Sequence, residues 1–310
     1  MQFFQTPNID FISKRKIAFI LSGLMFLIGI VSLVLHKGPN YGIDFKGGTS
    51  IVIKFDGKVT VPQIRSALGK ADLGKSEIKQ FGSTNEFLIY VAQQKELSAV
   101  EMAQKVEKTV GEQIKDVKYE IEKIDVIGPR IGEELRKAAV LAIFIALIMI
   151  LIYVGWRFEV VFAAGAIAAL FHDVLITLGA FSILNYEISL KEIAAFLTIV
   201  GYSLNDTIVV YDRIRENLKI MRGDNLATII NASINQVLSR TVITSLTTFT
   251  VVLILFLFGG KVLHGFAFAM LLGVVVGTYS SIFVASPIVY EWQMRHGGKR
   301  GLKMAKKKRS

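Results

Sequence analysis

The sequence AAFLTIVGYSLNDTIVVYDR, residues 194–213, decides the fold, because it is long enough and apolar enough to cross a lipid bilayer. Its second half carries an ionisable carboxyl group, Asp206, beside Asn205 and Thr207. Translocon scales put the cost of an aspartate at the centre of a membrane helix at about +2.5 to +3.5 kcal/mol. An acid in this position indicates a proton or ion site with a partner. The simpler alternative is an acid close enough to the interface to be hydrated.

Five further segments have the length and apolarity of membrane spans, in a chain whose 310 residues are 52% hydrophobic. The first span follows three basic residues, as in a signal sequence, but it lacks a small-residue cleavage site and predicts an uncleaved signal anchor. This hydropathy excludes a soluble enzyme. We expect a polytopic α-helical membrane protein with six transmembrane helices, at residues 17–35, 138–154, 160–183, 193–211, 241–258 and 262–290.

Basic residues are concentrated on one side of the expected spans. With a cytoplasmic N-terminus, the two short outer loops carry only Lys191 and Lys261, whereas the inner segments carry the other basic residues that flank the spans. The positive-inside rule therefore predicts that both termini are cytoplasmic. The basic tail directly follows a span, so we expect membrane lipids or a passing ribosome beside it, and no specific nucleic acid.

This orientation divides the chain into four parts. They are residues 1–36, the cytoplasmic N-terminus and first helix; residues 37–137, an extracytoplasmic domain; residues 138–290, a five-helix bundle with a cytoplasmic amphipathic loop at 212–240; and residues 291–310, the cytoplasmic tail.

The extracytoplasmic domain has the pattern of a ferredoxin-like α+β fold. GTSIVIKF alternates as a strand, residues 61–71 have helical spacing, and EIKQF pairs with EFLIYVA across a turn at residues 82–85. Ser98 can cap a second helix, with Glu101 three residues on, and KYEIEKIDVI ends the domain as a strand. The order βαββαβ is that of a split βαβ unit. No nucleophile elbow, HExxH motif or phosphate loop indicates a catalytic site.

One motif in this domain, Asp44-Phe45-Lys46-Gly47-Gly48-Thr49, differs from its surroundings. Two glycines before a strand indicate a turn that needs positive φ, with Asp44 bonded to its own backbone. The alternative is a hinge or docking motif near the membrane, formed by Asp44, Gly47, Gly48 and Thr49.

The loop at 212–240 also allows two interpretations. Asp224 can cap a helix whose apolar residues lie largely on one face, which is typical of an interfacial helix lying flat on the bilayer. The loop is otherwise a simple connector.

Polar residues recur inside the expected spans. From residue 193, a rise of about 1.5 Å per residue places Asp206 about 20 Å into the membrane. On the next span Arg240 begins a helical stripe with Thr244, Thr247 and Thr248, although its head can also snorkel to the interface and serve topology alone.

The third span contains His172 and Asp173 near mid-depth. A lone histidine on an apolar face is often a packed, neutral residue, but a charged carboxylate is not tolerated against lipid. One histidine and scattered acids form no metal-ligand set, and a chain without cysteine has no thiolate site. Small residues in AAGAIAAL and at Gly273 and Gly277 predict close helix packing in one bundle.

Together, one span, a large outer domain, a five-span bundle, the DFKGGT turn, the HD pair and SLNDTIVVYDRIREN resemble the SecD/SecF family of the RND superfamily. The resemblance covers nearly the whole chain. It implies a non-enzymatic accessory subunit of the Sec translocase in the bacterial plasma (inner) membrane. This subunit would use the proton-motive force to promote preprotein translocation and release.

The resemblance also assigns roles. It implies a proton relay at Asp206 and Arg240, completed by a carboxylate of SecD. Apart from the resemblance, the polar residues inside the spans are candidates for intramembrane support, namely His172, Asp173, Asn205, Thr207 and Thr244. Protons are the coupling ion and no cofactor is expected. The implied partners are SecD, the SecYEG translocon, unfolded preprotein and, more remotely, YajC and YidC. Two alternatives stay open: an RND-type exporter of small molecules or lipids, and a non-transporting scaffold in which Asp206 and Arg240 form a structural pair.

Overall fold

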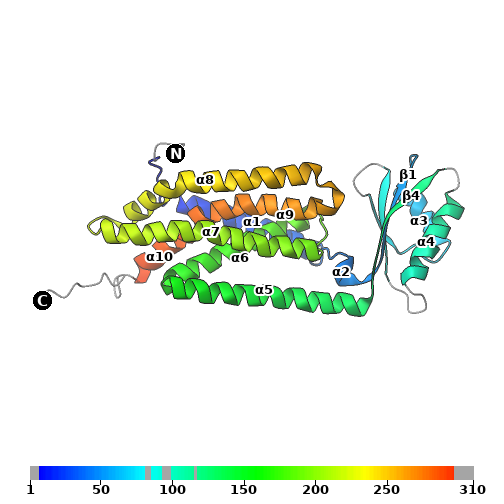
Figure 1. The fold of residues 1–310 in the computed structure, drawn as a ribbon, viewed down its shortest axis with the longest axis horizontal. Helices are drawn as coiled ribbons and strands as arrows, with labels where there is room; N and C mark the ends of the chain where they lie inside the picture. The colour runs from blue at the N-terminus through cyan, green and yellow to red at the C-terminus, as the bar shows by residue number, and fades with distance from the viewer. Residues whose placement is uncertain (1–6, 81–84, 93–98, 115–116, 297–310) are drawn as a thin grey trace. The chain divides into compact units, whose positions relative to one another are not determined.

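The computed structural model describes residues 7–80, 85–92, 99–114 and 117–296 and separates into two compact units (Figure 1). The first comprises Met1–Asn40, Ile143–Tyr186 and Lys191–Ser310, and the second comprises Tyr41–Ala142 and Glu187–Leu190. The expected turn at residues 82–84, the cap at Ser98 and the tail from residue 297 lie outside the described residues.

The described residues contain six helical stretches long and apolar enough to cross a membrane, which confirms the predicted class of fold. The last is interrupted by a π-helical turn, η1 (Ser281–Ala285), between α9 and α10. The helices are α1 (Arg15–Leu35), α5 (Pro129–Arg157), α6 (Val160–Ile183), α7 (Leu190–Ile220), α8 (Leu226–Phe258), α9 (Gly260–Ser280) and α10 (Ser286–His296).

Small residues set the packing of α1 on α6. Ser22 bonds to His172, Gly29 lies against Gly179, and Ser32 bonds to Ser182. The sequence offset is the same in all three layers, so the two helices run parallel. A Cβ on Gly179 would lie 2.8 Å from the Cα of Gly29, which only glycine permits. Close approach through small residues is the usual way in which membrane helices associate.

Close packing also joins α7 to α9. A Cβ on Gly277 would lie 3.0 Å from the Cβ of Ser203, and one on Gly273 would overlap the side chain of Ile199. The small residues expected to bring the helices together therefore do so.

The expected flat interfacial helix after residue 224 is wrong. The segment from Leu226 is the start of α8, which continues without a break into the fifth span. Asn225, not Asp224, caps it by accepting a hydrogen bond from the amide of Ala227 at 3.0 Å. Ile230 and Ile234 are fully buried in the bundle core, so the apolar face covers protein. An amphipathic pattern does not tell a lipid surface from a protein core.

The second unit is the predicted βαββαβ domain. Its strands β1 (Gly48–Phe55), β2 (Glu77–Gln80), β3 (Glu86–Val91) and β4 (Tyr119–Ile127) form one antiparallel sheet in the order β2-β3-β1-β4. The helices α3 (Val61–Gly69) and α4 (Ala99–Gln113) cover one face of it (Figure 1). Thr60 and Gln63 form a capping box at the start of α3. This arrangement is the ferredoxin-like order that the sequence predicted.

The segment Glu187–Leu190, between α6 and α7, belongs to this second unit. Ile188 forms a bridge with Tyr41 and its carbonyl accepts a bond from the amide of Gly42 at 2.8 Å. Lys79 pairs with Glu187 at 2.9 Å. Nothing in the local sequence indicated this, because the pairing joins residues almost 150 positions apart.

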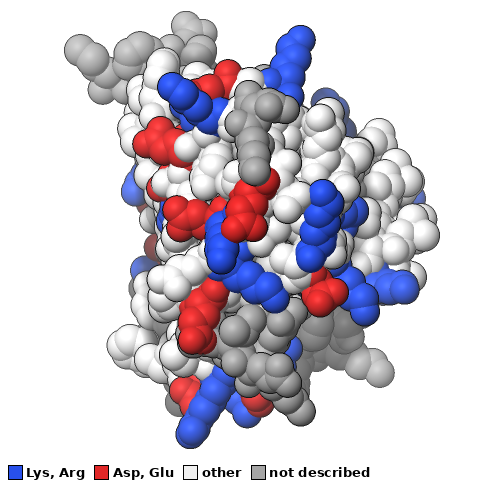
Figure 2. All heavy atoms as spheres, turned by 90° about the vertical axis from the view of Figure 1, so that its right-hand side faces the viewer, with Lys and Arg blue, Asp and Glu red and all other residues white. Residues whose placement is uncertain are grey.

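Charges on the face shown in Figure 2 are intermixed, with Lys and Arg beside Asp and Glu. Such a distribution is typical of a solvated surface, and no field of one sign covers this face.

Candidate functional site

The carboxyl group of Asp206 lies inside the bundle. Asp206 is only 2% exposed, and about 16 residues of α7 precede it, or roughly 24 Å of helix at 1.5 Å per residue. Among the described residues its carboxylate accepts one hydrogen bond, from Ser245 Oγ of α8 at 3.3 Å. The same hydroxyl lies 2.7 Å from Thr278 Oγ1 of α9. Asp206 thus has one weak neutral donor, few for a buried acid.

Two polar neighbours of Asp206 face outward instead. Asn205 and Arg240 are exposed on α7 and α8. Among the described residues Arg240 forms no direct ion pair with Asp206, but it lies close enough for its charge to act on that carboxyl group. Thr198 and Gly201 are also exposed on α7 and continue the row of Asn205 at helical spacing. The structure therefore places small and polar groups on the outer surface beside a buried acid.

The two threonines predicted as support bond within their own helices. Thr207 is buried and donates to the carbonyl of Ser203 at 3.1 Å. Thr244 donates to the carbonyls of Arg240 and Thr241 at 3.1 and 3.0 Å. Neither hydroxyl bonds to Asp206.

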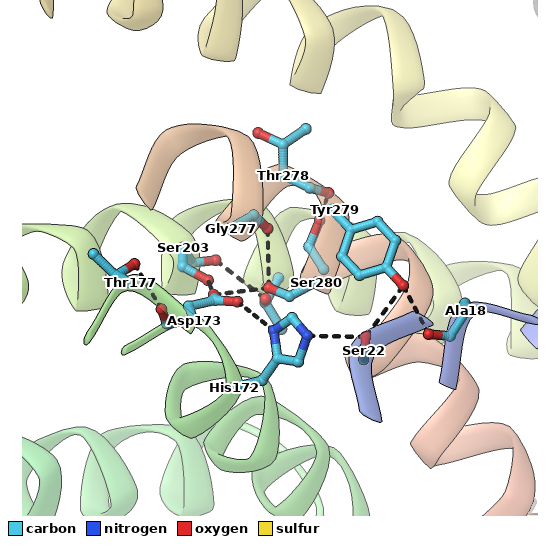
Figure 3. Close-up of polar contacts among 12 residues, drawn as sticks. Ala18, Ser22, His172, Asp173, Thr177, Ser203, Gly277, Thr278, Tyr279 and Ser280 are labelled. Carbon is cyan, nitrogen blue, oxygen red and sulfur yellow. Dashed lines mark hydrogen bonds and ion pairs between the residues drawn. The ribbon is translucent and has the colours of Figure 1, made fainter. Parts of the chain in front are cut away.

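The pair His172 and Asp173 forms a separate network, shown in Figure 3. Asp173 is 0% exposed, and its Oδ1 lies 2.9 Å from Nδ1 of His172. Its Oδ2 accepts hydrogen bonds from Ser203 of α7 at 2.5 Å and from Ser280 of α9 at 2.8 Å. This second buried acid is fully surrounded by donors from its own chain.

The network continues from His172 to α1. Nε2 of His172 lies 3.0 Å from Ser22 Oγ, which lies 3.2 Å from the hydroxyl of Tyr279. Tyr279 donates to the carbonyl of Ala18 at 2.9 Å. Sequence reasoning missed Ser22, Ser245, Tyr279 and Ser280, because single hydroxyl groups are common in membrane helices and only the rotation of each helix shows which ones meet an acid.

The Asp44 motif forms a turn whose carboxylate reaches another segment. Gly47 and Gly48 have φ of 67° and 121°, as the two glycines predicted. The carboxylate of Asp44 accepts from the amide of Leu190 at 2.8 Å, rather than from its own turn. Tyr90 donates to the carbonyl of Gly47 at 2.5 Å, and Thr49 is buried in β1 between Val91 and Val126.

The motif therefore fastens Glu187–Leu190 to the domain. Leu190 is also the first residue of α7, the helix that carries Asp206.

Metal binding finds no support in the described part of the chain, where no group of three or more His, Asp or Glu residues is placed to hold an ion.

Two family models match the sequence. "Protein export membrane protein SecD/SecF, C-terminal" matches residues 106–295, and "SecD/SecF GG Motif" matches residues 32–59. The second range contains the turn of Asp44, Gly47 and Gly48.

Curated relatives match over nearly their full length. The protein translocase subunit SecF of Rhodothermus marinus is 45% identical over 99% of this chain and 100% of its own, and that of Thermodesulfovibrio yellowstonii is 47% identical over 93% and 96%. The crystal structure of SecDF, a translocon-associated membrane protein from Thermus thermophilus, matches with a TM-score of 0.84 and 40% identity. That match covers 93% of this chain and 39% of the SecDF chain. The chain therefore belongs to the SecD/SecF family of protein-export membrane proteins.

Proposed function

We propose that this chain works as the SecF-type subunit of the Sec translocase, and that proton binding at Asp206 helps to move preproteins across the plasma membrane. The observation that carries this proposal is the incomplete environment of Asp206. A carboxylate that is 2% exposed receives one hydrogen bond, at 3.3 Å, from the described residues of its own chain. Intramembrane acids in such a position serve by default as proton or ion sites.

The groups that complete this site come from a second membrane protein. Asn205, Arg240, Thr198 and Gly201 are exposed beside Asp206, where a partner helix can approach closely and present polar groups. We infer that SecD supplies this helix and a carboxylate that shares the proton traffic. The SecYEG translocon and unfolded preprotein complete the assembly, YajC and YidC are further candidate neighbours, and membrane lipids surround it.

Proton movement supplies enough free energy for this task. One elementary charge that crosses 100 mV gains about 2.3 kcal/mol, which is comparable with the difference of a few kcal/mol between two conformers. Protons are then the coupling ion, and the mechanism needs no cofactor. With both termini cytoplasmic, protons pass inward and the α+β domain lies outside the membrane.

A path from the acid to the domain exists along α7. The first residue of this helix, Leu190, donates its amide hydrogen to Asp44, whose turn is held by Tyr90. A shift of α7 that follows a change of charge at Asp206 would therefore pull on the turn of the domain. Export in steps requires such coupling.

The test replaces Asp206 by Asn in the complex reconstituted with SecD and SecYEG. We expect loss of proton-dependent export by a factor of about 100 or more, since a proton site without its titratable group cannot cycle, with assembly unchanged. Asp212→Asn is the matched control, because Asp212 lies on the same helix but is half exposed and pairs with Arg157 at 3.1 Å. Normal proton-dependent export by Asp206→Asn would overturn the proposal.

A scaffold role is separated from a relay by exchanging the charges of Asp206 and Arg240. A structural pair survives the exchange, whereas a directional relay loses transport.

A further inference from the structure

A chain of hydrogen bonds that the transport proposal does not use runs from α7 and α9 through α6 to α1 (Figure 3). Its members Ser203, Asp173, His172 and Ser22 are at most 5% exposed. The chain ends at a backbone carbonyl, that of Ala18, which Tyr279 contacts at 2.9 Å. A carbonyl oxygen can only accept, and this fixes the direction of the bonds that lead to it.

Starting from the carbonyl of Ala18, the donor in each hydrogen bond of the chain can be assigned. Tyr279 uses its single hydroxyl hydrogen on the carbonyl of Ala18, so in the 3.2 Å contact Ser22 donates to Tyr279. Ser22 has then used its own hydrogen, and in the 3.0 Å contact it accepts from His172. Nε2 of His172 therefore carries a hydrogen.

The remaining contact joins Nδ1 of His172 to Oδ1 of Asp173 at 2.9 Å. A hydrogen bond needs one proton between these atoms, and it belongs either to the imidazole or to the carboxyl group. In the first case the pair is a cation beside an anion, and in the second both groups are neutral. The pair has no net charge in either form, and this makes it tolerable at membrane depth.

The surroundings of the pair support both forms. Ser203 and Ser280 donate to the other carboxylate oxygen at 2.5 and 2.8 Å. The imidazole ring is held between aromatic rings, with Phe26 of α1 edge-on at 5.5 Å and Tyr279 of α9 stacked at 6.0 Å.

Few other titratable groups face the pair. The α9 helix presents Tyr279, α7 presents Ser203 with Asp206 three residues further on, and α1 presents only Ser22 and Phe26.

We propose that His172 and Asp173 form a proton-binding site distinct from Asp206, which holds one shared proton and fastens α1 to α6 through Nε2 of His172 and Ser22. Loss of the shared proton leaves the lone pair of Nδ1 opposite the carboxylate at 2.9 Å, where the two repel each other. The site thus couples the binding of one proton to the contact between α1 and α6.

The direct test is ¹⁵N nuclear magnetic resonance of the full chain, labelled at its four histidines and reconstituted in lipid bilayers. The signals of His172 are identified by their loss in His172→Gln. We expect Nε2 to be a protonated nitrogen at neutral pH, and Ser22→Ala to shift its resonance. A non-protonated Nε2 in the wild-type chain overturns the proposal.

A second variant tests the direction of the chain. Tyr279→Phe removes the acceptor of the Ser22 hydroxyl, so we expect the ¹⁵N resonance of Nε2, which donates to that hydroxyl, to shift while the nitrogen stays protonated. Tyr153→Phe is the control, since Tyr153 is 45% exposed on α5. An unchanged Nε2 resonance in Tyr279→Phe would contradict the assignment. Neither measurement depends on export, so the outcome is independent of the role of Asp206.

Discussion

Two buried carboxyl groups in the same bundle have opposite surroundings. Asp173 is bonded to His172, Ser203 and Ser280, whereas Asp206 receives one hydrogen bond at 3.3 Å, from Ser245. Both acids are linked to α9. Asp173 accepts directly from Ser280, whereas Asp206 is linked through Ser245 of α8, whose hydroxyl lies 2.7 Å from that of Thr278. Asp173 thus has three hydrogen-bond partners in its own chain, and Asp206 has one among the described residues.

The difference in hydrogen bonding indicates that Asp173 serves the stability of the bundle, whereas Asp206 is the candidate for transport. A complete site holds helices together at rest, and its hydrogen bonds are lost when the acid is removed. A site with one weak donor contributes little to the fold of the single chain, and under the proposed function its charge changes when a proton binds. Location in one bundle therefore does not give two acids the same role.

The largest effect on stability is expected for Asp173→Ala. Hydrogen bonds between membrane helices contribute about 0.6 kcal/mol each on average, so the loss of three bonds, with their donors left buried, should cost about 2 kcal/mol or more. Asp206→Ala, which removes one long bond, should cost about 0.6 kcal/mol by the same measure. Unfolding of the purified chain in mixed lipid and detergent micelles measures both. Equal losses of unfolding free energy in the two variants would contradict the inferred difference between Asp173 and Asp206.

A second pair of substitutions distinguishes the packed contact between α1 and α6 from the exposed surface of α7. Gly179→Leu places a side chain where a Cβ already lies 2.8 Å from the Cα of Gly29, and overpacking of this kind costs about 1–3 kcal/mol. Gly201 is exposed beside Asn205, with no atom within 4 Å of an added Cβ. Gly201→Leu should leave the stability of the isolated chain unchanged and weaken co-purification with SecD.

The control for this surface is Gly223→Leu, because Gly223 is also exposed with open space around it but lies in the loop before α8. If Gly201→Leu and Gly223→Leu retain the partner equally well, the row beside Asp206 is not the contact surface.

The sequence predicted most of the fold because hydropathy and period are local properties. Span lengths follow from bilayer thickness, and the strand β1 was predicted with its exact bounds from the alternation in GTSIVIKF. The same local pattern led to the wrong prediction of a surface helix from Leu226, because an amphipathic sequence is the same whether its apolar side chains face lipid or a protein core.

The candidate site was predicted only in part. The cost of a charge in hydrocarbon identifies Asp206 and Asp173 from the sequence alone. Their partners depend on how each helix is rotated, which hydropathy does not determine. Ser22 meets His172 from 150 positions away, and Asp44 meets Leu190 from 146 positions away.

Asp10 is a third carboxylate that can be compared with Asp173 and Asp206. It accepts hydrogen bonds, as Asp173 does, but it precedes the first membrane helix. It accepts hydrogen bonds from the amide of Ser13 at 3.1 Å and from Asn231 at 2.7 Å, and these bonds hold its pKa below the ordinary 3.8. Asn231 also accepts from the amides of Phe11 and Ile12 at 3.0 Å, so the carboxylate helps to hold the N-terminal segment on α8.

The folded pKa of Asp10 lies below the unfolded one, so its contribution is present above the unfolded pKa and is lost as the pH falls through the folded pKa. We therefore expect hydrogen exchange at Phe11 and Ile12, corrected for intrinsic rates, to accelerate below about pH 4. Because Asp10 is exposed, water screens the interaction and the effect should be the smallest of those considered. Asp10→Asn keeps an acceptor for Asn231 without the charge and should abolish the pH response. If hydrogen exchange still accelerates at low pH in Asp10→Asn, a group other than Asp10 controls the N-terminal segment. The hydrogen bonds to Asp10 would then not stabilise the fold as those to Asp173 are expected to.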